Sequence, residues 1–316
     1  MISSSSLFPV SLMYAENLGD LSEDVYFVKH NRDPDRSVQV GVAHLMLHNK
    51  PATLGPVVLI HGSFSNRGFW ITRNGIGMAR FLLEQGYDVW LMEHRGHGIT
   101  PRNKDYLNNT VERYVLYDVP AVNEFIQEKT GENPFWIGHS LGGVTIASAV
   151  AADLLTKDNC RGMVLFGTQT ISRPRYLWVP FVASLLRLKV NWQGELDGRK
   201  LKIGPENESA GMFKEYISSN SWFGVWQLKS KALKLLPAWR KANEVPLLAI
   251  AGRADKSDPA VACIKFANKY GGNKDILLLG KAEGFARDYG HVDMVVSKSA
   301  AKEVWPKVSQ WLKEQL

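Results

Sequence analysis

The segment 134–145, Pro-Phe-Trp-Ile-Gly-His-Ser-Leu-Gly-Gly-Val-Thr, constrains the fold of this chain more than any other part of the sequence. A short apolar run with β-propensity ends at Gly138, and a helix-forming stretch begins at Gly142. Glycines at these two positions permit a turn that is too tight for larger side chains, and Ser140 lies at its centre. Such a turn exposes the serine hydroxyl at a helix N-terminus, where free N–H groups favour negative charge. The pattern therefore predicts a nucleophilic serine.

Composition places the chain among ordinary globular proteins. It has 316 residues, of which 45% are hydrophobic and 22% charged, so it can bury a sizeable core. Its two cysteines, Cys160 and Cys263, form no disulfide framework, which favours a reducing compartment. No cationic and apolar leader begins the sequence, and no apolar run is long enough to span a membrane. We therefore expect a cytoplasmic protein.

Short apolar runs alternate with helical patterns along most of the chain, which predicts an α/β fold with a mostly parallel, eight-stranded sheet flanked by helices. The predicted strands are Val25–His30, Val38–His48, Gly55–His61, Asp88–Glu93, Phe135–His139, Arg161–Gly167, Val245–Ala251 and Asp275–Leu279. The predicted helices are Ile76–Gln85, Val115–Thr130, Gly142–Leu155, Ala260–Tyr270 and Ala300–Leu316.

The alternation is interrupted between residues 171 and 243, and we interpret this stretch as a helical cap inserted into a core formed by residues 1–170 and 244–316. The stretch holds 13 Lys and Arg against five Asp and Glu, whereas the rest of the chain is nearly neutral. A solvated helical surface explains this charge without a partner, and contact with an anionic membrane surface is the alternative. No motif for nucleic-acid binding accompanies it. The tryptophans of this stretch fit either a small core or a lid that lines an apolar acyl pocket.

Together these segments resemble the α/β-hydrolase superfamily, in its capped serine esterase and lipase branch. The motifs that carry the resemblance are His61-Gly62, Glu93–Gly98, Gly138–Gly143, Gly252–Asp255 and Gly290-His291. The region from Trp70 to Arg102 looks like acid lipases and lysophospholipase-type enzymes. One departure is the turn after the fourth strand, which in this family often begins with Asp and here begins with Glu93. The resemblance implies the α/β-hydrolase fold.

A serine hydroxyl becomes nucleophilic when a neutral imidazole accepts its proton and an acid orients that imidazole. In α/β-hydrolases these groups follow in the order serine, acid, histidine, on loops at the carboxyl ends of strands. His291 is the only one of eight histidines that follows the elbow, and it comes after the last predicted strand. Asp255 comes directly after the preceding strand and is the favoured acid. Asp258 is the alternative acid, although its place before Pro259 also suits a helix cap.

The resemblance also implies two backbone N–H groups that bind the oxyanion of the tetrahedral intermediate. We expect them at Leu141, which follows the nucleophile, and at Ser63, in the loop after the strand Gly55–His61. The residues that we expect to line the substrate pocket are Phe64, His139, Tyr176, Trp178, Trp222 and Val292. No metal or organic cofactor is implied, because the triad activates its own nucleophile.

These features lead to the hypothesis of a serine carboxylic ester hydrolase that forms an acyl-enzyme on Ser140 with a small-molecule or lipid-like ester. One alternative keeps the triad and changes the substrate, as in a thioesterase or an acyltransferase, because a basic cap would favour the phosphates of coenzyme A. A further alternative is a non-catalytic scaffold with the same fold, whose cap recruits a partner or a membrane. Nucleic acid is not an expected partner.

Overall fold

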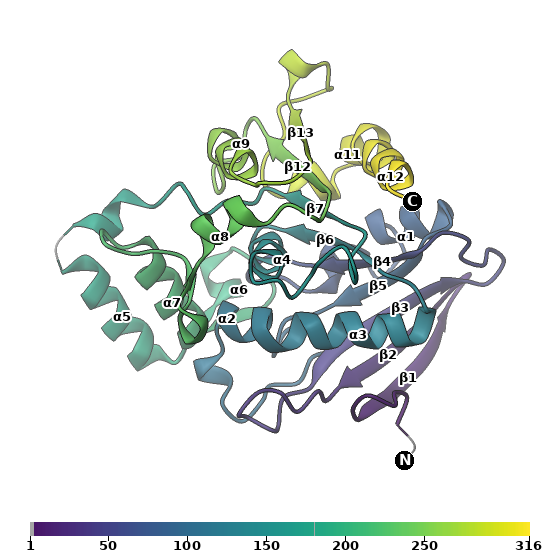
Figure 1. Ribbon diagram of the computed structural model, residues 1–316, viewed down its shortest axis with the longest axis horizontal. Coiled ribbons are helices and arrows are strands. Elements are labelled where there is room, and N and C mark those ends of the chain that lie inside the picture. The colour runs from purple at the N-terminus through teal and green to yellow at the C-terminus, as the bar shows by residue number, and fades with distance from the viewer. Residues whose placement is uncertain (1–2, 180) are drawn as a thin grey trace.

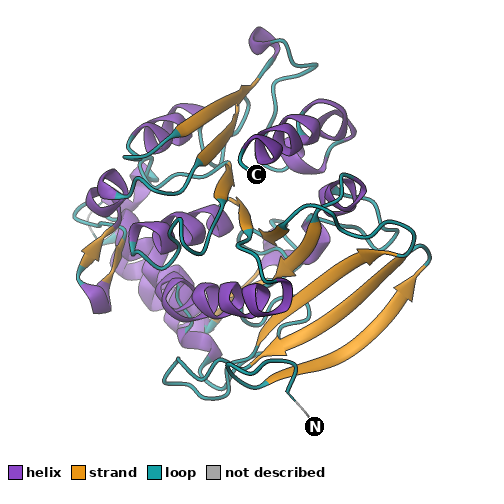
Figure 2. Ribbon diagram, turned by 45° about the vertical axis from the view of Figure 1, so that its right-hand side comes forward, coloured by secondary structure: helices purple, strands orange, loops and turns teal. Residues whose placement is uncertain are grey.

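The computed structural model describes residues 3–179 and 181–316, and a nine-stranded sheet runs through its centre (Figure 1). The strand order is β1-β2-β3-β5-β4-β6-β7-β12-β13. The strands are β1 (Val10–Leu18), β2 (Leu21–Val28), β3 (Val40–Leu47), β4 (Pro56–Ile60), β5 (Asp88–Met92), β6 (Phe135–His139), β7 (Gly162–Phe166), β12 (Leu247–Gly252) and β13 (Lys274–Leu279). From β5 to β13 all neighbours are parallel, whereas β1, β2 and β3 form the long antiparallel ribbon that Figure 2 shows at one edge. The predicted fold class is confirmed.

All eight predicted strands are present, but the predicted number of strands is wrong by one. Strand β1 was missed, and the reason lies in its position at the edge of the sheet, where it pairs with β2 alone. Val10 is the only residue of β1 that is buried. A strand with so little burial on either face lacks the apolar alternation that reveals strands in a sequence.

Helices cover both faces of the sheet, and the strand side chains alternate between them because successive residues of a strand point to opposite faces. Val58 and Ile60 of β4 pack with the residues of α3 and α4, whereas Val57 and Leu59 pack with α1 and α12. The helices of the core are α1 (Met78–Glu84), α2 (Val111–Arg113), α3 (Val119–Thr130), α4 (Leu141–Ala151), α9 (Ala260–Asn268), α10 (Asp293–Val296), α11 (Lys298–Glu303) and α12 (Trp305–Glu314). The last predicted helix is divided into α11 and α12, with a proline in the first turn of α12.

The predicted insertion carries its own small elements between β7 and β12. They are α5 (Val182–Gln193), β8 (Glu195–Asp197), α6 (Gly198–Leu201), β9 (Asn207–Ser209), α7 (Ala210–Asn220), β10 (Gln227–Leu228), β11 (Leu233–Lys234) and α8 (Leu235–Lys241). Helices α5 and α7 pack on each other at one end of the molecule (Figure 1). Helix α8 instead packs against α4. Its buried Trp239 also stacks on Phe266 of α9, with ring centroids 5.1 Å apart. This carboxyl-terminal part of the insertion therefore contributes to the core.

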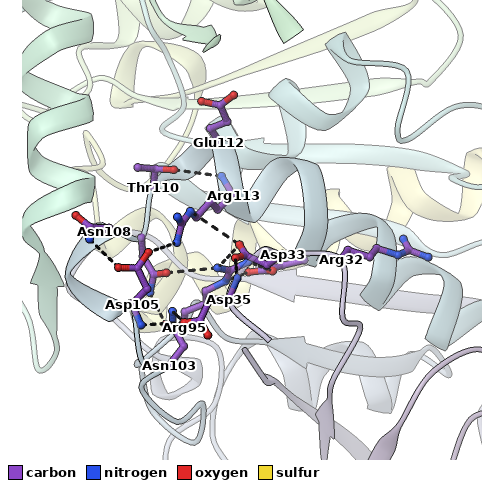
Figure 3. A network of polar contacts seen from close by, with 12 residues as sticks. Arg32, Asp33, Asp35, Arg95, Asn103, Asp105, Asn108, Thr110, Glu112 and Arg113 are labelled. Atoms are coloured by element: carbon purple, nitrogen blue, oxygen red, sulfur yellow. Dashed lines mark hydrogen bonds and ion pairs between the residues drawn. The ribbon is translucent and has the colours of Figure 1, made fainter. Parts of the chain in front are cut away.

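A buried arginine, Arg95, links the turn after β5 to two other segments through Asp33 and Asp118. Arg95, in the turn after β5, is 1% exposed and binds both carboxylate oxygens of Asp118 at 2.6 and 2.8 Å. Its remaining guanidinium nitrogen binds Asp33 at 2.8 Å. Figure 3 shows Arg95 and Asp33 within a wider network that includes Arg113 and Asp105. Because the charges are paired where water is excluded, each one depends on its partners.

Replacing Arg95 with alanine should lower the free energy of unfolding by about 3–5 kcal/mol, because the buried carboxylates of Asp33 and Asp118 would lose the cation that binds them at 2.6–2.8 Å. Urea denaturation measures the change. The control is Arg32→Ala, which removes an ion pair to Glu124 whose side chains are 34% and 40% exposed. The control should cost less than about 1 kcal/mol. Equal losses in the two variants would contradict the importance of the buried network.

Candidate active site

Ser140 occupies the sharp turn between β6 and α4, as the sequence predicts. Its backbone has φ 53° and ψ −116°, a conformation that L-residues rarely adopt and that costs about 1–3 kcal/mol. Its N–H donates to the carbonyl oxygen of Phe166 at 2.9 Å, which holds the turn against β7. A Cβ at Gly142 would lie 2.5 Å from the carbonyl oxygen of Ile60 and 2.7 Å from that of His61, so only glycine fits there.

The structure brings His291 and Asp255 together. The Nδ1 of His291 lies 2.8 Å from Asp255 Oδ2, and the Asp255 side chain is fully buried. The other oxygen of Asp255 accepts the N–H groups of Ser257 and Asp258 at 2.9 and 2.8 Å. Because both oxygens are engaged, the carboxylate has a fixed orientation and can hold the Nδ1–H tautomer of the imidazole. The favoured acid therefore lies where an orienting acid must lie.

The alternative acid, Asp258, lies on the other side of the imidazole, beside the serine. Its Oδ2 accepts the hydroxyl of Ser140 at 3.4 Å and is 3.8 Å from Nε2 of His291. Its Oδ1 accepts the side-chain amide of Gln169 at 2.7 Å. In this arrangement the hydroxyl of Ser140 points to Asp258 rather than to His291. Proton transfer to the imidazole thus requires the hydroxyl to turn toward Nε2.

The proton affinities of Asp258 and His291 are shifted in ways that depend on each other. Burial raises the pKa of Asp258 to about 6, although the nearby His291 and the hydrogen bond from Gln169 act to lower it. Burial lowers the pKa of His291, but the hydrogen bond and charge of Asp255 outweigh that effect, and the charge of Asp258 adds to them. The net result is a raised pKa for His291. The two carboxylates together favour the imidazolium that forms during proton transfer from serine.

Two backbone N–H groups face the same space as the serine. Those of Ser63 and Leu141 donate to no acceptor within the described part of the chain, and both residues line the cavity in front of Ser140. Ser63 belongs to residues 61–66, which follow β4 and are called the oxyanion loop below. The next N–H along this loop, that of Phe64, donates to Glu208 Oε1 at 3.0 Å and is already occupied. The Ser63 N–H, one residue earlier, has no acceptor among the described residues and lines the cavity, so the expected oxyanion donor remains available there.

The cavity in front of Ser140 has a volume of about 600 Å³ and is enclosed by both core and cap. Eleven of the 22 residues that line it are apolar or aromatic, among them Phe64, Val111, Val144, Tyr176, Met212, Phe213, Tyr216 and Trp226. The polar and charged residues include Gln169, Arg173, Glu208, Lys256 and Asp258. Such a lining accepts an extended apolar group and places polar and charged side chains beside it.

Two of the six predicted pocket residues, Phe64 and Tyr176, line this cavity, and the other four do not. His139 lies beneath the site, where its ring contacts that of His291 at 4.5 Å and its Nε2 binds the carbonyl oxygen of His291 at 2.8 Å. Trp178 and Trp222 pack edge to face at 5.6 Å on the outside of the cap, and Val292 is half exposed. A sequence shows that such residues are near the site but does not show which way they point.

Among the cavity residues that sequence reasoning missed, five come from α7 and β9 and five from the segment 169–174. Met212 and Tyr216 are four residues apart on α7, so they share one face of the helix. That spacing was a usable signal. Glu208 had no such signal, because an acidic residue in a basic, polar stretch has the sequence pattern of a solvated loop, yet it is 2% exposed.

The fold and this geometry agree with known families. A family model described as the alpha/beta hydrolase fold matches residues 55–198, which include β4, the oxyanion loop and the serine turn. The chain therefore has the alpha/beta hydrolase fold. A solved structure of this fold, a monoacylglycerol lipase from Paleococcus ferrophilus, aligns with a TM-score of 0.60 at 17% identity, covering 84% of this chain and 97% of that one. Est1E from Butyrivibrio proteoclasticus with bound ferulic acid aligns with a TM-score of 0.60 at 16% identity, covering 92% and 98%.

Curated proteins that resemble part of this chain are lipases. Human lipase member N is 34% identical over 132 residues, which are 38% of this chain and 31% of the relative. Human gastric triacylglycerol lipase is 32% identical over 131 residues, 39% of this chain and 31% of the relative. The matched region thus spans about a third of the length of each relative.

The position of Asp258 predicts a change in the pH dependence of catalysis. Ionised Asp258 favours the imidazolium of His291, so Asp258→Asn should lower the pKa of His291. Because the base must be neutral to accept a proton, the acidic limb of kcat/KM against pH should then move to lower pH. Initial rates of hydrolysis of an uncharged ester, measured across the pH range, give the position of this limb.

The matched control for this measurement is Asp153→Asn, which changes the net charge equally at an exposed position outside the cavity. Its pH profile should superimpose on that of the unchanged protein. An acidic limb that stays in place, or moves to higher pH, in Asp258→Asn would show that Asp258 does not act on the imidazole.

Proposed function

We propose that this protein is a serine carboxylic ester hydrolase that forms an acyl-enzyme on Ser140. The observation that carries the proposal is the arrangement at one sheet edge: a strained, half-buried serine that lines the cavity, the His291–Asp255 pair at 2.8 Å, and two unoccupied N–H donors. The relationship to lipases supports an ester as the substrate. The apolar and aromatic side chains that line the cavity support an uncharged or lipid-like acyl group.

The reaction begins when the hydroxyl of Ser140 turns from Asp258 to Nε2 of His291, which accepts its proton as the oxygen attacks the ester carbonyl. The carbonyl oxygen becomes an oxyanion and is bound by the N–H groups of Ser63 and Leu141. The imidazolium, oriented by Asp255, then gives its proton to the leaving alcohol, and the carbon–oxygen bond of the ester breaks. Water attacks the acyl-serine by the same route, with His291 again as base, and releases the acid.

The test combines a chemical label with turnover. A fluorophosphonate probe should label the protein, and Ser140→Ala should lose both the label and, by about 10³-fold or more, the hydrolysis of p-nitrophenyl esters from acetate to palmitate. The control is Ser230→Ala, a cap serine that binds Glu112 outside the cavity. Label retained by Ser140→Ala would overturn the assignment. The same assay with acyl-coenzyme A tests the thioesterase alternative. Faster turnover of the thioester than of the ester would favour that alternative.

We further propose that the cap contacts an anionic lipid surface through α5. Phe181, Leu185, Leu188 and Trp192 follow one another at intervals of four, three and four residues, so they form one stripe along the helix. Their exposed fractions are 80%, 63%, 68% and 88%. Residues 171–194 also contain four Arg and Lys and no Asp or Glu. An apolar stripe with basic neighbours is the pattern of a helix that lies in a membrane interface.

This contact would be peripheral, since no described helix is long and apolar enough to cross a bilayer. Arg173 and Tyr176 come from the same basic segment and line the cavity.

Exchanging Leu185 and Leu188 together for serine should lower partition onto phosphatidylcholine vesicles that contain phosphatidylglycerol by about ten-fold or more, since burying one leucine is worth roughly 1.5–3 kcal/mol. Co-sedimentation measures it, with pure phosphatidylcholine as the uncharged comparison. The control is Leu12→Ser with Leu18→Ser on β1, which are 44% and 45% exposed. Equal loss in both double variants, or binding that ignores phosphatidylglycerol, would contradict the proposal.

A further inference from the structure

The cap binds the oxyanion loop at the backbone of Phe64. Glu208 of β9 accepts the N–H of Phe64 at 3.0 Å, and the N–H of Glu206 donates to the carbonyl oxygen of Phe64 at 3.1 Å. Both polar groups of this residue are thus bound by the same short segment of the cap. Phe64 itself has φ 57°, in the left-handed region, so its conformation depends on contacts that hold it there.

The close approach of the cap is possible because Gly204 has no side chain. A Cβ at this position would lie 2.1 Å from the carbonyl oxygen of Phe64. The segment that carries Glu208 therefore lies directly on the oxyanion loop, with no space for a water molecule or a flexible side chain between the two backbones at this point.

His97 supports the same arrangement from the core. Its Nδ1 donates to the carbonyl oxygen of Ser65 at 2.8 Å, and its Nε2 is 3.5 Å from Glu208 Oε2. Both side chains are buried, with 1% of His97 and 2% of Glu208 exposed. Burial acts to lower the pKa of His97, but the charge of Glu208 and its hydrogen bonds outweigh that effect and raise the pKa. A protonated His97 also offsets the negative charge that Glu208 brings near the site of the oxyanion.

These contacts determine the direction of the available oxyanion donor. The N–H of Phe64 belongs to the peptide that follows Ser63, so holding it restricts rotation on the carbonyl side of Ser63. The Ser63 N–H lies one peptide earlier in the same short loop. An oxyanion donor stabilises a transition state only when its direction is set before the reaction starts.

We propose that Glu208 is a positioning residue for the oxyanion hole, through which the cap holds Ser63 in its active orientation. The inference rests on the proposed ester hydrolysis. It makes the cap a part of the catalytic machinery as well as a wall of the cavity. Displacing β9 from Phe64 weakens oxyanion binding while the serine, histidine and Asp255 keep their places.

The experiment compares Glu208→Ala and Glu208→Gln with a matched control, Glu195→Gln. Glu195 lies on β8, which pairs with β9, and it joins the cap to Arg102 of the core without touching the oxyanion loop. The variants Glu208→Gln and Glu195→Gln therefore lose the same charge from the same small sheet. Kinetics with a p-nitrophenyl ester separate kcat from KM, and a trifluoromethyl ketone measures the binding of a tetrahedral oxyanion.

Glu208→Ala should lower kcat by about 10- to 100-fold, less than or equal to the loss of a whole donor, with KM nearly unchanged. Glu208→Gln keeps an oxygen acceptor but loses the charge, so its kcat should fall by about three- to ten-fold. In both variants the affinity for the trifluoromethyl ketone should fall in parallel with kcat. Glu195→Gln should keep kcat and ketone affinity within about two-fold of the unchanged protein.

The inference is overturned if Glu208→Gln and Glu195→Gln behave alike, or if the Glu208 variants raise KM and leave kcat and ketone affinity unchanged. If Glu208→Ala does not fold, as circular dichroism would show, the two isosteric variants still decide the question. Absence of ester hydrolysis in the unchanged protein would count against the proposed function instead. Hydrolysis that is insensitive to Glu208 would count against this inference alone.

Discussion

The contact between Gly142 and the end of β4 is the constraint on which the active site depends. Strands β4 and β6 are parallel neighbours, so the oxyanion loop and the serine turn leave the sheet at the same edge. The missing side chain of Gly142 lets the first turn of α4 rest on the carbonyl oxygens of Ile60 and His61. The proposed nucleophile and the two proposed oxyanion donors are therefore set relative to each other by backbone packing, so they would need little reorganisation when charge develops.

The two carboxylates of the site, Asp255 and Asp258, are also held in place by backbone contacts. Asp255 uses one oxygen for His291 and the other for the N–H groups of Ser257 and Asp258. The acid that orients the imidazole thus also folds the short turn that brings Asp258 to the serine. The two aspartates are three residues apart and lie on opposite sides of the His291 ring. Asp255 contacts Nδ1, and Asp258 lies toward Nε2.

Patterns in the sequence were sufficient for the parts of the molecule that follow from local rules. The buried parallel strands are continuous apolar runs, and the glycines around Ser140 mark a turn that few other sequences permit. Ser140, Asp255 and His291 could be predicted to lie close together because each follows a strand whose carboxyl end reaches the same edge of the sheet.

Contacts between segments that are distant in the sequence left no such pattern. The pairing of Glu208 with Phe64, the exposure of Trp178 and Trp222, and the approach of Asp258 to Ser140 depend on the direction of side chains in three dimensions. The strand β1 was missed because almost none of it is buried.

The place of Asp258 has a consequence for the end of the catalytic cycle. Ester hydrolysis on Ser140 would create a second carboxylate within the same small volume, because Asp258 Oδ2 is 3.4 Å from the serine oxygen. Two like charges this close repel each other, and with a pKa of about 6 for Asp258 the repulsion can be relieved at pH 7 only by protonating that carboxylate, at a cost of about 1.4 kcal/mol. An acid product is thus driven out of a cavity that suits its uncharged ester. Weak product inhibition would then follow from the charge of one side chain, without any movement of the cap.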